Sequence, residues 1–104
     1  MVIAGPDTVS AAETFLLAMR TLPHVTLIGE TTNGILSNML GKTLPNSWTF
    51  SLSNEVYRDS AGLNYEAVGI APEIEVPIFS MNDLDAGRNS ALDKALELLE
   101  FPVQ

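Results

Sequence analysis

The chain has 104 residues, of which 46% are hydrophobic, and it carries a net charge of −8 from thirteen acidic and five basic residues. Such a length and composition suit one domain or subdomain, and the acidic surplus argues against nucleic acid or an anionic membrane as a partner. The lack of cysteine excludes disulfides and thiolate chemistry, and the single histidine argues against a metal site. We therefore expect no metal, no cofactor and, in the absence of a long apolar run, no membrane-spanning segment.

The first third of the chain predicts a strand, a helix and a second strand. Residues 1–4 form a short apolar strand, and a helix is expected over residues 10–21, ended by Pro23. Residues 25–28 are continuously apolar, as in a parallel strand buried on both faces. Four side chains recur at helical spacing and are expected in the core: Phe15, Leu16, Met19 and Leu22.

The middle of the chain predicts two strands, residues 36–43 and 47–57, joined around residues 44–47. The second strand alternates apolar and polar side chains. Its Trp48 could line a substrate groove, but the alternation favours a place in the core. Residues 59–62 form a turn.

The last third predicts a short strand over residues 74–78, which Pro77 places at a sheet edge. A final helix begins at Asn89 or Ser90. Its apolar stripe consists of Leu92, Ala95, Leu96 and Leu99.

Ser10 is the candidate nucleophile, because it follows an apolar strand and opens the first helix. The first N–H groups of a helix lack internal partners and carry partial positive charge, so the N–H of Ala11 could hold an oxyanion formed when Ser10 attacks an acyl group. The alternative is that Ser10 only caps the helix.

Several motifs follow one another in a specific order over nearly the whole chain: residues 7–13, 25–34, 44–46, 65–76 and 83–92. This series resembles the C-terminal half of the catalytic domain of the C-terminal processing (tail-specific) serine peptidases. The resemblance implies an α/β fold, specifically a β-β-α spiral (ClpP-like, crotonase-like) core subdomain with a mixed sheet and two main helices. It also implies that residues 1–104 form the C-terminal part of a catalytic domain in a longer, extracytoplasmic or periplasmic protein that cleaves a peptide or protein substrate. The resemblance is also compatible with a homo-oligomer.

The catalytic base separates two branches of that family. One branch has a lysine directly after the Gly-Glu-x-Thr-x-Gly turn, where this chain has Ile35, and Lys42 lies seven residues further on. The other branch, similar to the tricorn core protease, uses serine, histidine, a second serine and a glutamate that Glu66 matches. By resemblance the catalytic histidine precedes the nucleophile by a long stretch of chain, and His24 is expected to be a surface residue.

Alternatives stay open at this stage. Glu66 could be solvated or could accept hydrogen bonds from local backbone, while Glu30, Thr32 and Gly34 are expected to have structural roles in the turn. The same fold serves non-catalytic binding of apolar ligands in the interphotoreceptor retinoid-binding relatives. A structural or oligomerisation subdomain is a third possibility.

Overall fold

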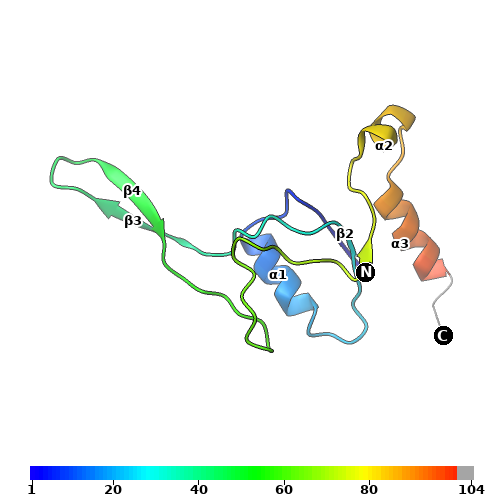
Figure 1. Cartoon of the computed structure of the whole chain (residues 1–104), viewed down its shortest axis with the longest axis horizontal. Helices are drawn as coiled ribbons and strands as arrows, with labels where there is room; N and C mark the ends of the chain where they lie inside the picture. The colour runs from blue at the N-terminus through cyan, green and yellow to red at the C-terminus, as the bar shows by residue number, and fades with distance from the viewer. Residues whose placement is uncertain (101–104) are drawn as a thin grey trace.

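The computed structural model describes residues 1–100, which form a small parallel sheet with helices and a projecting hairpin (Figure 1). In chain order the elements are β1 (Val2–Ala4), α1 (Ala11–Met19), β2 (Leu27–Gly29), β3 (Met39–Thr43), β4 (Thr49–Ser53), β5 (Ile74–Glu75), α2 (Met81–Ala86) and α3 (Ser90–Glu100). The predicted α/β fold is confirmed, with α1 and α3 as the main helices and α2 as a short addition.

The parallel sheet has the strand order β1-β2-β5. Val2 lies opposite Leu27 in one pair and Ile28 lies opposite Ile74 in the other. Every residue of the central strand β2 is buried, as its continuous apolar sequence predicts. The edge position predicted for β5 from Pro77 is confirmed.

The core lies where α1 meets the sheet. Ala4, Leu16, Leu27 and Ile70 are buried together. The prediction that Phe15 and Leu22 belong to the core is wrong, because their side chains are 54% and 39% exposed. The fully buried residues of α1 are instead Glu13 and Leu16, which lie three residues apart on one face of the helix. This buried face is narrower than the stripe of four apolar residues predicted from the sequence.

The hairpin of β3 and β4 is antiparallel and projects away from the sheet at the left of Figure 1. Leu40 lies opposite Leu52, and Lys42 lies opposite Phe50. Every residue of both strands is exposed, and the predicted core position of Trp48 is wrong since its side chain is 71% exposed. The alternation predicts the strand correctly, but nothing within residues 1–100 covers its apolar face.

The C-terminal segment contains one helix that the sequence did not indicate. The α2 helix begins after Ser80, whose hydroxyl accepts from the Asp83 N–H, and ends at the left-handed Gly87. The expected cap of α3 is confirmed, because the Asn89 side chain accepts from the Leu92 N–H at 3.1 Å. No helix within residues 1–100 is long and apolar enough to cross a membrane.

The predicted apolar stripe of α3 is only partly buried. Ala91 and Ala95 are buried against the body, and α3 contacts β1 and β2. The three leucines of the predicted stripe are 45–60% exposed: Leu92, Leu96 and Leu99. Ala91 and Ala95 lie four residues apart and form the buried face of the helix.

Candidate active site

The Ser10 backbone has an unusual conformation for a residue that is not glycine. Its φ is 55° and its ψ is −123°, and its side chain makes no capping hydrogen bond although Ser10 is the N-cap of α1. A positive φ in a non-glycine residue costs on the order of 1–3 kcal/mol and is concentrated at functional sites. Strained turns of this kind expose a nucleophilic serine at the start of a helix. The Ser10 hydroxyl therefore does not cap α1, contrary to the alternative that the sequence left open.

The first N–H groups of α1 leave a donor open beside Ser10. The Ala12 N–H donates to the Val9 carbonyl at 3.1 Å, and the Thr14 N–H donates to the Ser10 carbonyl. Within residues 1–100 the Ala11 N–H has no acceptor. This donor is the one expected at an oxyanion next to the Ser10 hydroxyl.

The turn after β2 holds Ser10 in place. The Ser10 N–H donates to the Ile35 carbonyl at 2.7 Å, and the Asn33 N–H donates to the Thr8 carbonyl at 3.1 Å. The Asn33 side chain also donates to the Pro6 carbonyl. The loop before α1 is thus joined by hydrogen bonds to the turn that contains the Gly-Glu-x-Thr-x-Gly motif.

Glu13 organises this turn, and the sequence analysis missed it. Its side chain is 0% exposed and accepts from the Thr32 hydroxyl at 2.6 Å, the Gly34 N–H at 2.7 Å and the Ile35 N–H at 2.8 Å. A Ser-x-x-Glu spacing is the signature of a capping box, in which the glutamate bonds to the N-cap N–H. That spacing could have drawn attention to Glu13, but its carboxylate binds a turn about twenty residues away.

The expected structural roles of Thr32 and Gly34 are confirmed. The Thr32 hydroxyl accepts from the Ile70 N–H at 2.8 Å, and the Gly34 carbonyl accepts from the Ala67 N–H at 2.8 Å. Gly34 has φ +83°, and a Cβ there would lie 2.7 Å from the Gly69 nitrogen. The two turns approach so closely that only glycine fits between them.

Glu66 binds the backbone that follows Ile35. Its Oε2 accepts from the Leu36 N–H at 2.9 Å and from the Ser37 N–H at 3.0 Å. Glu66 is half-buried, and its Oε1 has no partner within residues 1–100. The carboxylate is therefore neither fully solvated nor bound to local backbone, and one oxygen stays open for a further donor.

The segment that precedes Glu66 is fixed by a Tyr65–Asp59 pair. The Tyr65 hydroxyl donates to Asp59 Oδ2 at 2.7 Å. This hydrogen bond lowers the pKa of Asp59, helped by the Leu63 N–H, and raises the pKa of Tyr65. This hydrogen bond closes the loop of residues 59–65 and so helps to fix the position of Glu66, the next residue.

Neither His24 nor Lys42 is placed beside Ser10. His24 is exposed and follows the far end of α1, whose nine residues span roughly 14 Å. Lys42 is exposed on β3, in the hairpin that projects from the body (Figure 1). Within residues 1–100 no cluster of His, Asp or Glu could hold a metal ion.

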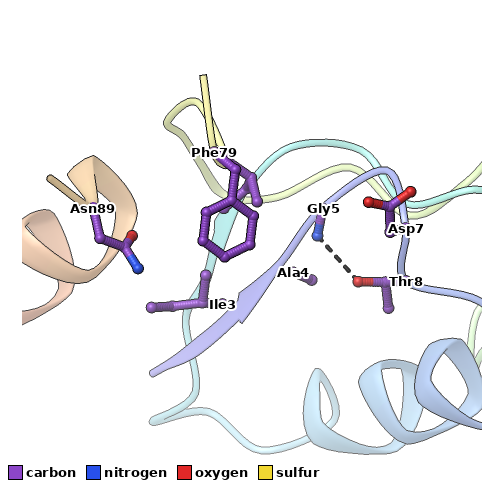
Figure 2. A pocket seen from close by; sticks show the side chains of 8 residues that line it. Ile3, Ala4, Gly5, Asp7, Thr8, Phe79 and Asn89 are labelled. Atoms are coloured by element: carbon purple, nitrogen blue, oxygen red, sulfur yellow. Dashed lines mark hydrogen bonds between the residues drawn. The ribbon is translucent and has the colours of Figure 1, made fainter. Parts of the chain in front are cut away.

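A cavity of about 340 Å³ opens at the carboxyl end of β1 (Figure 2). The Phe79 ring lies between the end of β1 and Asn89, and Asp7 and Thr8 lie at the other end of the cavity. The Thr8 hydroxyl accepts from the Gly5 N–H at 3.1 Å. The cavity is walled mainly by apolar groups and lies along the loop that leads to Ser10.

Residues 1–76 match the model of peptidase family S41. The chain belongs to this family. No curated protein sequence matches the chain significantly.

The chain is also similar to several solved structures. The chain is similar to a putative peptidase from Parabacteroides merdae, with 32% identity and a TM-score of 0.78 over 94% of this chain and 31% of that one. The tricorn protease matches with 24% identity and a TM-score of 0.73 over 93% of this chain and 10% of that one. The photosystem II D1 C-terminal processing protease matches with 21% identity and a TM-score of 0.64 over 73% of this chain and 20% of that one. The last two likenesses show the fold alone. The chain spans about a third or less of these proteins.

Proposed function

We propose that Ser10 is the nucleophile of a serine peptidase and that the chain forms the C-terminal part of its catalytic domain. The observation that carries this proposal is the strained Ser10 backbone with an uncapped hydroxyl, next to an Ala11 N–H that has no acceptor within residues 1–100. A serine that served only as a cap would bond to the first turn and would not need a positive φ.

In the proposed mechanism the Ser10 oxygen attacks the scissile carbonyl of a peptide or protein substrate. The Ala11 N–H donates to the resulting oxyanion, and a histidine outside these 104 residues takes the Ser10 proton and later gives it to the leaving amine. The open Oε1 of Glu66 would support that histidine assembly. Ile35 stands where the serine/lysine branch has its base and cannot accept a proton, which favours the tricorn-like branch.

The test compares variants of a protein in which this chain is joined to the rest of an S41 catalytic domain. Ser10→Ala should abolish peptide hydrolysis and labelling by a fluorophosphonate, while Lys42→Ala should leave both nearly unchanged. Retained hydrolysis in Ser10→Ala, with most activity lost in Lys42→Ala, would refute the assignment.

Glu66→Gln tests the orienting role in the same protein. Glutamine can keep its carbonyl oxygen at the Leu36 and Ser37 N–H groups, so the fold should persist. The rate should fall ten-fold to several thousand-fold, on the order of 1.4 to 5 kcal/mol of transition-state stabilisation. Unchanged turnover would leave Glu66 with a purely structural role.

The isolated 104-residue chain should not be a working peptidase. A serine hydroxyl needs a base within hydrogen-bond reach, and the sequence has one histidine, His24, at the far end of α1. We expect no hydrolysis and no fluorophosphonate labelling at Ser10. Labelling that is lost in His24→Ala would make His24 the base.

A second candidate function is binding of an apolar ligand without catalysis, and the apolar cavity beside β1 favours it. A retinoid or fatty acid would then bind to the protein with the rest of the catalytic domain attached, and Ser10→Ala would not change its affinity. Fluorophosphonate labelling of Ser10 in the same protein would decide for the peptidase.

A further inference from the structure

One face of the projecting hairpin carries large apolar side chains. Strand alternation and the register put Leu40, Lys42, Phe50 and Leu52 on one face, and Leu44 and Trp48 continue the same alternation at the tip. We define these six residues as the apolar hairpin face; the five apolar ones are 41–71% exposed. The opposite face carries small or polar residues, among them Thr43 and Ser51, and one large apolar residue, Met39, at its end.

This arrangement is not one that a hairpin keeps in water by itself. A two-stranded hairpin without a partner is marginal, because no second layer buries its apolar side. An exposed cluster of large apolar side chains marks a surface that another polypeptide covers.

The dimensions of the chain give the same result. The radius of gyration is 17.2 Å, against about 13 Å for a compact domain of this length. The accessible surface is 7175 Å², whereas a folded chain of 11.2 kDa exposes about 5,700 Å². The excess over the whole chain, of which the hairpin is one part, is roughly 1,500 Å², and each partner buries approximately 800 Å² in a standard interface.

We propose that the apolar hairpin face docks against the part of the S41 catalytic domain that these 104 residues do not contain. The Parabacteroides merdae peptidase matches 94% of this chain with a TM-score of 0.78, yet the match covers only 31% of that protein's own length. The unmatched part of that peptidase is therefore more than twice as long as the matched part. In a protein with the same arrangement, this further chain is available to cover the apolar hairpin face. This inference rests on the family membership and not on a catalytic role for Ser10.

A second copy of this chain fits the face less well. Each chain has a net charge of −8, so two copies repel, and the face itself carries a cation, Lys42, in its centre. A complementary partner surface is therefore mainly apolar. A peptide without its own fold would have to lose its conformational entropy to cover so wide a face.

The first experiment measures amide hydrogen exchange of residues 39–53. It compares the isolated chain with a chimera in which this chain replaces the matching third of the Parabacteroides merdae peptidase. The hairpin amides should exchange rapidly in the isolated chain and at least ten-fold more slowly in the chimera. Equal exchange in both would overturn the proposal.

Matched variants identify the face that is responsible. The double variant Leu40→Ser, Phe50→Ser should lose the protection in the chimera, while Thr43→Ala, Ser51→Ala on the opposite face should keep it. All four side chains are exposed in residues 1–100, so the isolated variants should retain the circular dichroism spectrum of the parent chain. Protection that survives in the first variant would contradict the proposal.

A second measurement does not depend on the chimera folding. Trp48 is the single tryptophan of the sequence, so 5-fluorotryptophan labels one site on the apolar hairpin face. Adding the Parabacteroides merdae peptidase without its matching third should shift the fluorine resonance, and the Leu40→Ser, Phe50→Ser variant should abolish that shift. No shift, or self-association of the isolated chain through this face in sedimentation, would overturn the proposal in favour of no partner or of a second copy.

Discussion

Replacing Glu13 by glutamine tests whether one buried carboxylate holds the Ser10 turn together. Glutamine can place its carbonyl oxygen at the position that accepts from the Thr32 hydroxyl and the Gly34 N–H. Its NH₂ group then faces the Ile35 N–H, a second donor, so that hydrogen bond is lost and two donors stay without an acceptor.

The magnitude follows from these contacts. A buried donor left without an acceptor costs about 1–3 kcal/mol, and hydrogen bonds to a neutral acceptor are worth about half as much as those to a charged one. Together these effects predict a loss of about 2–4 kcal/mol for Glu13→Gln. A domain of this size has a total stability of about 5–15 kcal/mol, so the loss is a large fraction of it.

The assay is urea unfolding of the isolated chain, followed by far-ultraviolet circular dichroism. Glu97→Gln is the matched control, because Glu97 is exposed and pairs with Lys94 three residues away, so its loss should stay within about 0.5 kcal/mol. Exchange of the Ser10 amide should also become faster in Glu13→Gln, since its acceptor is the Ile35 carbonyl. A Glu13→Gln chain as stable as Glu97→Gln would refute the reasoning.

Two further predictions concern the isolated chain. Gly34→Ala should destabilise it more than Gly62→Ala in urea unfolding: both glycines have φ near +82°, but a Cβ at Gly34 would meet the Gly69 nitrogen at 2.7 Å, while Gly62 has open space. Equal losses would mean that the two turns can move apart. Asp83→Asn should lower Tm at pH 7, because the hydrogen bond from the Ser90 hydroxyl stabilises the ionised carboxylate and lowers the pKa of Asp83 below its ordinary value of 3.8. This stabilisation is fully present above pH 3.8 and is lost as the pH falls through the folded-state pKa. The two chains should therefore converge in Tm at acid pH, and a constant difference would contradict the assignment.

Local patterns in the sequence determined the elements and much of their order. The apolar run before Gly29 gave the buried central strand, Pro77 gave the sheet edge, and Asn89 gave the start of α3. The position of Ser10 at the first turn of a helix was also readable. These features depend on backbone preferences and on periodicities of a few residues, which one stretch of chain expresses by itself.

Only the tertiary structure decided what those elements touch. Glu13 and Glu66 bind backbone groups 21 to 30 residues away in sequence, and no local rule reads such pairings. The hydrogen bond from the Ser10 N–H to the Ile35 carbonyl likewise joins residues that are far apart in the sequence. The exposure of Trp48 and of the leucines of α3 depends on which other parts of a domain lie against them, because alternation tells which side chains share a face but not what covers that face.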